Sequence, residues 1–137
     1  MNLSEIRDFL AAEFAPVFVH QDVVVEAAEG GTARLKMVPD ARHLRPGAIV
    51  SGPTLMMLAD TAAYAALLSL PQDARMAVTS NLSVSFLRAG RGAIVQDARV
   101  VKAGRRLATI LTEARDDAGE PLAIATLTYA MPGAAVS

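Results

Sequence analysis

The sequence predicts an α+β domain in which antiparallel strands surround one long buried helix. Segment 53–70 is apolar on every side and holds a single charge, Asp60. A helix without a polar face is normally buried. The strand-like segments elsewhere are joined by turns too short for the helical crossovers of a parallel sheet. We therefore expect residues 1–137 to form one domain with about six strands.

The chain before the central helix predicts a short helix followed by a hairpin. Segment 3–14 carries an apolar stripe at helical spacing, and Asn2 with Glu5 three residues later is typical of a helix start. Segment 17–28 is rich in β-branched residues, and segment 32–39 alternates polar and apolar side chains. We expect these two segments to pair across a glycine turn.

Residues 39–47 form a predicted loop with two arginines and His43 directly before the central helix. This loop is either a solvated basic segment or a rim that meets an anionic ligand. Within the helix start, Ser51 is suited to be the N-cap and Pro53 fits the first turn. The unpaired N–H groups of a first helical turn are suited to an oxyanion or a polarised carbonyl.

Four further segments after the central helix predict strands. Their β-branched residues and alternation end at turns rich in Gly, Arg and Asp. The segments are 76–87, 93–101, 107–114 and 121–130.

Composition excludes several classes of function. With 13 basic and 14 acidic residues, the chain lacks the positive charge that holds nucleic acid. It has no cysteine and two histidines, His20 and His43, so we expect no metal site. The N-terminus lacks the pattern of a signal peptide, and a membrane span with Asp60 at its centre is disfavoured. We therefore expect a cytoplasmic protein with no membrane partner.

Segment 47–62 contains a glycine loop, then Ser-Gly-Pro, then Leu-Ala-Asp-Thr-Ala. This order resembles the pattern of the hotdog-fold thioesterases, in which a Gly-containing loop is followed by His-Gly-Gly and then by Leu-Ala-Asp-x-Ala. Segment 78–88 looks like the family's strand after the helix, and 104–106 is similar to its later Gly-Arg turn. The resemblance runs from about residue 17 to residue 131 and looks closest to the phenylacetic-acid-degradation type of acyl-CoA thioesterase. It implies a curved antiparallel sheet wrapped round the helix, assembled into a homodimer or homotetramer.

The resemblance also implies site residues. Asp60 would be the general base or nucleophile, the Gly52 N–H would polarise the thioester carbonyl, and the Thr79 hydroxyl would help to hold the water or the carboxylate. The chain departs from the family at three positions, where the usual Asn, His and second Gly are Arg45, Ser51 and Pro53. Candidate substrate-binding residues are Ser51, Arg45, Asn81, Arg88, Arg105 and Arg106. Turn arginines are suited to the phosphates of CoA.

The spacing of two of these residues favours a site shared between subunits. Gly52 and Asp60 are eight residues apart, or about 12 Å along a helix. One carbonyl can hardly meet both, but two antiparallel helices from two subunits would bring them together. We therefore expect a thioesterase dimer or tetramer that hydrolyses acyl-CoA to a carboxylic acid and CoA, with no cofactor apart from the CoA of the substrate.

Three alternatives stay open from the residues alone. In the first, Asp60 is a buried structural carboxylate bonded by Thr61, Thr79 or a neighbouring chain, and Ser51 is a plain N-cap. In the second alternative, the chain is a non-catalytic dimer that binds acyl-CoA. A dehydratase of the same fold is a third class, for which His43 is the available histidine.

Overall fold

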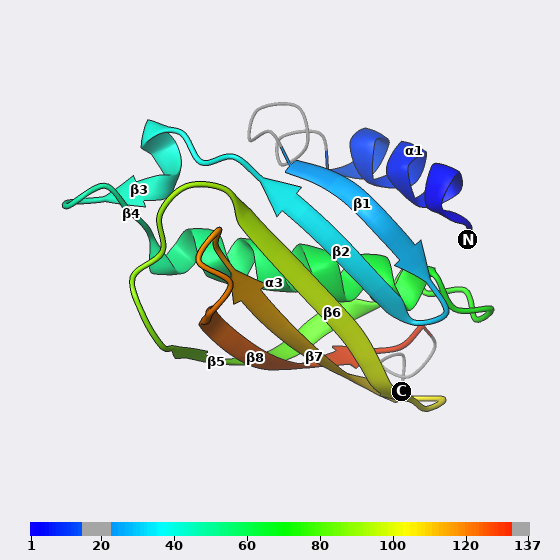
Figure 1. Ribbon diagram of the computed structural model, residues 1–137. Coiled ribbons are helices and arrows are strands. Elements are labelled where there is room, and N and C mark those ends of the chain that lie inside the picture. Colours follow the sequence, from blue (N-terminus) through cyan, green and yellow to red (C-terminus); the bar gives the residue numbers. More distant parts are fainter. Residues whose placement is uncertain (15–22, 133–137) are drawn as a thin grey trace.

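The long apolar segment forms the central helix. A computed structural model describes residues 1–14 and 23–132. In it, helix α3 (Gly52–Leu68) lies against one face of a six-stranded antiparallel sheet of order β1-β2-β6-β7-β8-β5. All six strands contact α3, so the sheet curves around the helix (Figure 1). The predicted α+β class and strand number are confirmed.

The strands follow the predicted segments within two residues at each end, with one exception. They are β1 (Val23–Glu29), β2 (Thr32–Met37), β5 (Val78–Phe86), β6 (Ile94–Ala103), β7 (Leu107–Arg115) and β8 (Pro121–Ala130). The exception is the first strand, because the predicted residues 17–22 lie outside the described residues. Gly30 and Gly31 turn the β1–β2 hairpin at φ +57° and +85°, a region that glycine adopts readily.

The N-terminal helix α1 (Leu3–Glu13) begins as predicted. The Asn2 side chain accepts a hydrogen bond from the Glu5 N–H at 2.9 Å, and the Glu5 carboxylate accepts one from the Asn2 N–H at 3.0 Å. These two bonds satisfy donors that the first helical turn would leave unpaired. The helix buries Ile6 and Leu10 against the core beside β1.

The predicted loop 39–47 contains short regular structure instead of an open basic segment. It forms a 3-10 turn, η1 (Ala41–His43), and a small ribbon of β3 (Leu44–Arg45) and β4 (Ile49–Val50). His43 is only 2% exposed, and its Nδ1 accepts a hydrogen bond from the Asp40 N–H at 2.9 Å. Of the two interpretations left open for this loop, the solvated one therefore does not hold for His43, because the turn folds its ring inward.

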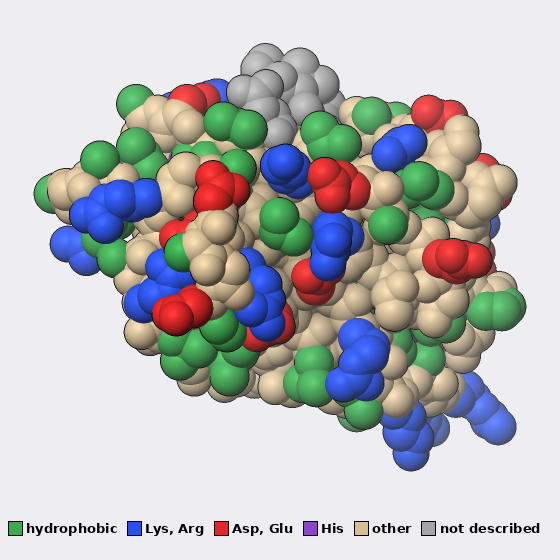
Figure 2. Space-filling model, viewed as in Figure 1, with side chains coloured by type: hydrophobic (Ala, Val, Ile, Leu, Met, Phe, Trp, Pro, Cys, Tyr) green, Lys and Arg blue, Asp and Glu red, His purple; other side chains and the backbone are tan. Residues whose placement is uncertain are grey.

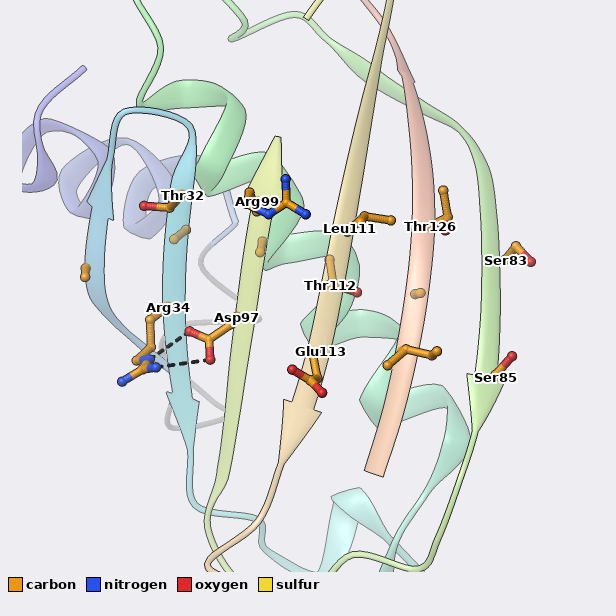
Figure 3. A pocket seen from close by; sticks show the side chains of 15 residues that line it. Thr32, Arg34, Ser83, Ser85, Asp97, Arg99, Leu111, Thr112, Glu113 and Thr126 are labelled. Carbon is orange, nitrogen blue, oxygen red and sulfur yellow. Dashed lines mark hydrogen bonds and ion pairs between the residues drawn. The ribbon is translucent and has the colours of Figure 1, made fainter. Parts of the chain in front are cut away.

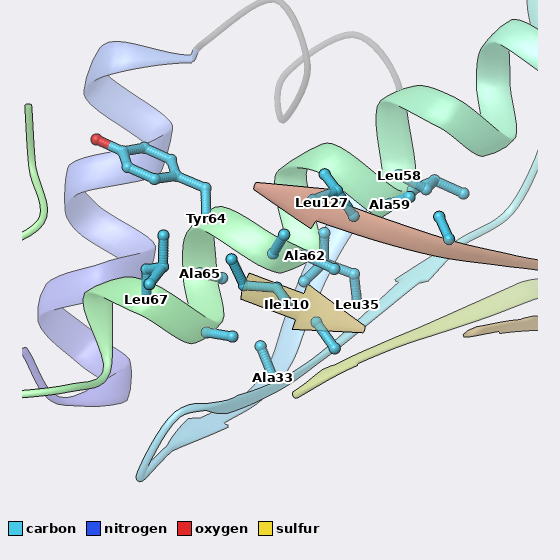
Figure 4. Packing of buried hydrophobic residues seen from close by; sticks show 14 of the residues in the cluster. Ala33, Leu35, Leu58, Ala59, Ala62, Tyr64, Ala65, Leu67, Ile110 and Leu127 are labelled. Atoms are coloured by element: carbon cyan, nitrogen blue, oxygen red, sulfur yellow. The ribbon is translucent and has the colours of Figure 1, made fainter. Parts of the chain in front are cut away.

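The core lies between α3 and the sheet. Four alanines of α3 have no exposed surface, and their small side chains let the strands approach the helix closely. Larger side chains from three strands fill the remaining space, namely Leu35, Ile110 and Leu127 (Figure 4). Residues 62–68 of the helix are thus buried on every side, as its composition predicts, whereas the first half of the helix has exposed and half-exposed positions.

An ion pair ties the turn after β5 to the turn before β8. The Arg88 guanidinium donates to both carboxylate oxygens of Asp116, at 3.1 and 2.5 Å. The Asp116 side chain is only 7% exposed and also accepts from the Arg91 and Ala118 N–H groups. In the same turn, the Gly90 carbonyl accepts from the Val50 N–H at 2.9 Å. The ion pair therefore supports the segment that leads into α3.

Basic and acidic side chains are interspersed over the face shown in Figure 2. Among the described residues, no helix is both long and apolar enough to cross a bilayer.

We expect Ile110→Ala to lower the free energy of unfolding by about 3 kcal/mol, since it removes a fully buried side chain and leaves a cavity. Ile124 on the neighbouring strand is 45% exposed, so Ile124→Ala is the matched control and should change stability by less than about 1 kcal/mol. Urea unfolding of both variants measures the difference. Equal losses would contradict the assigned core.

We expect the stabilisation from Asp116 to disappear in acid. The hydrogen bond from Arg88 lowers the pKa of the Asp116 carboxyl from its ordinary 3.8 to about 2. A lowered pKa stabilises the fold above the ordinary value, and the gain is lost as pH falls towards about 2. Asp116→Asn should therefore melt at a lower temperature than the wild type near neutral pH. This difference in melting temperature should become smaller between about pH 4 and 2. Asp117→Asn, in the same turn, is the control. A difference in melting temperature between Asp116→Asn and the wild type that does not depend on pH would contradict the stabilising role of the Asp116 carboxylate.

Candidate functional site

Asp60 lies in the middle of α3, where two hydroxyls from neighbouring strands hold one of its carboxylate oxygens. The Thr79 hydroxyl donates to Asp60 Oδ1 at 2.6 Å, and the Tyr129 hydroxyl lies 2.6 Å from the same oxygen. Tyr129 also lies within hydrogen-bonding distance, 2.9 Å, of the Asp60 carbonyl oxygen. None of the described residues donates to Oδ2. One carboxylate oxygen is therefore held while the other is free to accept a proton.

The strand pairing explains why these two hydroxyls meet. Thr79 of β5 and Tyr129 of β8 are directly opposite each other in the antiparallel ladder, so their side chains share one face of the sheet. That face is the one that packs on α3. The other predicted partner of Asp60, Thr61, donates instead to the Met57 carbonyl of its own helix turn at 2.8 Å. Of the two hydroxyls named from the sequence, only Thr79 reaches the carboxylate.

Tyr129 is a site residue that the sequence analysis missed. Burial, together with the negative charge of Asp60 and the hydrogen bond to it, raises the pKa of the Tyr129 hydroxyl well above its usual value of 10. The hydroxyl therefore stays protonated and remains a donor across the physiological range. One signal was available, since Tyr129 is one of two tyrosines and lies in the last strand. The sequence does not show which residue of β5 it faces.

A pocket of about 360 Å³ opens beside Asp60. The site residues Asp60, Thr79 and Tyr129 form part of its wall. The remaining lining is mostly apolar or aromatic and comes from α1 and its C-cap, from α3, and from the segment that leads into the first residue of β5. Among the described residues it comprises Leu10, Phe14, Thr61, Tyr64, Arg75, Met76, Ala77 and Val78. The free oxygen of Asp60 thus lies at a hollow suited to an apolar group.

The start of α3 leaves one backbone donor available. The Ser51 side chain caps the helix by accepting from the Thr54 N–H at 3.3 Å, which confirms the N-cap prediction for Ser51. The Ser51 N–H donates to the His43 carbonyl, and Pro53 has no N–H. The Gly52 N–H has no acceptor in the described part of the chain. It is therefore the free donor at the positive end of the helix.

Gly52 is packed closely on its own subunit. A Cβ at this position would lie 3.4 Å from the Phe86 ring. Within this chain Gly52 and Asp60 are separated by about two turns of helix, or about 12 Å. The two groups therefore do not converge on one point within a single subunit.

The predicted substrate-binding residues are dispersed. Arg88 is engaged by Asp116, as described above. Arg45 is exposed on the β3–β4 ribbon, whereas Arg105 and Arg106 are exposed in the β6–β7 turn. The Arg106 carbonyl accepts from the Met131 N–H at 2.8 Å, which brings this turn to the end of β8 that carries Tyr129. The structure thus places Arg105 and Arg106 at the same end of the sheet as the Asp60 pocket.

Asn81 faces away from Asp60. A bulge between Thr79 and Asn81 adds one residue to β5, so Asn81 pairs with Thr128 and not with the residue that faces α3. Two residues further along β5, Ser83 lines a hollow on the opposite side of the sheet. The bulge therefore separates Thr79 and Asn81, which simple alternation would place on one face.

That second hollow is larger, about 810 Å³, and open. Figure 3 shows its hydroxyl and charged side chains on the sheet face opposite α3, with Arg34 and Asp97 joined in an ion pair at 2.8 Å. Its described lining contains neither Thr79 nor Tyr129, the two residues whose side chains bond to Asp60. We therefore assign the candidate active site to the smaller pocket.

Comparison with known proteins identifies the family. Residues 47–123 match the model of the thioesterase superfamily, and no curated protein matches the chain. A candidate thioesterase from Silicibacter sp. TM1040 is 30% identical, with TM-score 0.83, and the match covers 96% of this chain and 92% of that one. A candidate thioesterase from Ralstonia eutropha JMP134, related to phenylacetic acid degradation, is 26% identical, with TM-score 0.76 and coverages of 84% and 89%.

A third solved structure, a hypothetical thioesterase from Streptococcus pneumoniae TIGR4 with coenzyme A, is 20% identical and shares the fold, with TM-score 0.80 and coverages of 93% and 97%. The expected hotdog fold and thioester hydrolase class are confirmed at the level of the family. Because the family model matches more than half of the residues of this chain, the chain belongs to the thioesterase superfamily.

Proposed function

We propose that this protein is an acyl-CoA thioesterase whose active site is shared between two subunits. The observation that carries the proposal is the pair of free groups on α3, the Asp60 Oδ2 and the Gly52 N–H. An acid–base group and an oxyanion donor are what thioester hydrolysis requires. The coenzyme A present with the pneumococcal relative supports CoA as the carrier of the acyl group.

In the proposed reaction, water attacks the thioester carbonyl carbon while Asp60 Oδ2 takes one of its protons. The electrons of the C=O π bond move to the carbonyl oxygen, where the Gly52 N–H of the other subunit stabilises the negative charge. When the C=O bond reforms, the C–S bond breaks and the sulfur leaves as a thiolate, which takes up a proton. The products are a carboxylic acid and CoA, and no cofactor takes part.

The free edge of the sheet supports a dimer. Strand β5 is an edge strand, and seven of its nine residues are exposed. Apolar side chains along and beside it are more than half exposed, namely Met76, Val78, Phe86 and Leu87. A two-fold pairing of β5 with its copy would satisfy the unpaired backbone groups and cover these side chains. It would also bring the two α3 helices side by side in opposite directions.

The pocket and the nearby turn supply the rest of the substrate site in this proposal. The apolar lining beside Asp60 takes the acyl group, and Arg105 and Arg106 contact the phosphates of CoA. Arg45, on the exposed ribbon near the start of α3, is a further candidate for the phosphates.

We expect Asp60→Asn to reduce turnover by about 10²- to 10⁴-fold, because an amide cannot accept the proton of water. Thiol release from a panel of aromatic and aliphatic acyl-CoA esters measures this and gives the acyl preference. The exposed Asp8→Asn is the control and should keep wild-type turnover. If Asp60→Asn keeps full turnover, the assignment of the base is wrong. A wild type that binds acyl-CoA without hydrolysing any ester would instead favour the binding-dimer alternative.

We expect two inactive variants to restore activity when they share a dimer. Gly52→Pro removes the N–H, and Ser51 already has the extended backbone that a following proline requires. Gly52→Ala keeps the N–H and controls for contact with Phe86. Co-refolding Gly52→Pro with Asp60→Asn should recover about a quarter of wild-type activity, since half of the dimers are mixed and each has one intact site. No recovery in proven mixed dimers would contradict the shared site.

A further inference from the structure

Two hydroxyls act on the same oxygen of Asp60, and they differ in how firmly the fold holds them. Thr79 lies on the edge strand β5 and is exposed, whereas Tyr129 lies on the interior strand β8 and is 3% exposed. Tyr129 contacts both the carboxylate and the backbone carbonyl of Asp60, at 2.6 and 2.9 Å. It is therefore the better anchored of the two donors.

Aromatic packing fixes the ring of Tyr129. The Tyr64 ring stacks on it with centroids 6.1 Å apart and planes inclined by 8°. Phe14 in turn packs edge-on against Tyr64 at 5.5 Å. The Tyr64 hydroxyl donates to the Arg75 carbonyl and not to Asp60. Of the two tyrosines, only Tyr129 therefore directs its hydroxyl at the carboxylate.

Holding Oδ1 determines which way the carboxylate faces. A carboxylate that can rotate about χ2 presents either oxygen at varying angles, whereas one with two bonds to a single oxygen presents the other in one direction. Positioning a reacting group in this way contributes to rate, because the bound geometry is already close to that of the reaction. The same two bonds also stabilise the charge of Asp60, whose side chain is half-buried.

We propose that Tyr129 is a positioning residue of the thioesterase reaction, whose hydroxyl holds Asp60 Oδ1 so that Oδ2 faces the attacking water. This inference rests on the role of Asp60 in the proposed function. The alternative is that Tyr129 only joins β8 to α3 through the Asp60 carbonyl. A purely structural bond would alter stability without a specific effect on turnover.

The test is Tyr129→Phe, which keeps the ring and its stacking and removes the hydroxyl. We expect kcat to fall about tenfold or more with little change in KM, since a hydrogen bond to a charged group is lost. Tyr64→Phe is the matched comparison, because it also removes one hydroxyl from the pocket but none from Asp60. Its effect on kcat should be several times smaller. In an Asp60→Asn background, Tyr129→Phe should not lower the residual turnover further.

The outcomes separate this inference from the proposed function. Full activity in Asp60→Asn overturns the proposed function. An inactive Asp60→Asn beside a Tyr129→Phe with wild-type kcat overturns only the role of Tyr129. The inference is also overturned if Tyr129→Phe loses the same factor in the Asp60→Asn background as in the wild type.

A second measurement does not depend on the folding of Tyr129→Phe. Incorporated fluorotyrosine labels the two tyrosines of the chain, and Tyr64→Phe assigns their resonances. We expect Asp60→Asn to shift the ¹⁹F resonance of Tyr129, whereas Asp97→Asn, on the opposite sheet face, should leave it in place. A Tyr129 resonance that does not respond to Asp60→Asn would contradict the hydrogen bond on which the inference depends.

Discussion

The position of one half-buried carboxylate in an apolar helix constrains much of this structure. The sheet covers one side of α3 because the helix has few polar side chains, and Asp60 lies half-buried between the helix and two strands. A carboxylate that is partly removed from water is stabilised by hydrogen bonds, and two strands supply them through Thr79 and Tyr129. The register between β5 and β8 is therefore tied to the chemistry, because a slip of β5 by one residue would turn the Thr79 hydroxyl to the other side of the sheet, away from Tyr129.

Different interactions leave the two reactive groups of the proposed site available, the Asp60 carboxylate and the Gly52 N–H. At Asp60, side-chain donors hold one oxygen and leave the other free. At the start of α3, the cap of Ser51 and the missing N–H of Pro53 leave the Gly52 N–H as the available donor. The family pattern has His and a second Gly beside Gly52, and the replacements here preserve the backbone donor, because Ser51 and Pro53 are both favourable at a helix start.

Much of the fold could be predicted from the sequence because hydrophobic periodicity and turn residues are local signals. The same signals, with the family motif, identified Asp60, Gly52 and Thr79. What could not be predicted depends on contacts between distant segments. The bulge that turns Asn81 outward, the pairing of Arg88 with Asp116 and the meeting of Tyr129 with Asp60 each join residues more than 15 positions apart or depend on strand register. The burial of His43 could not be predicted either, because the sequence left open whether loop 39–47 is solvated.

The geometry of a rigid helix connects the proposed site to the proposed assembly. Because α3 is continuous from Gly52 to Leu68, no local rearrangement can bring the Gly52 N–H to Asp60 without unwinding about two turns. A second α3 running in the opposite direction provides the donor without any such distortion. The edge strand that offers hydrogen bonds to a second copy, β5, is also the strand that carries Thr79. Pairing at this edge would therefore order the Asp60 site while it brings in the missing donor, so that assembly and catalysis would depend on the same strand.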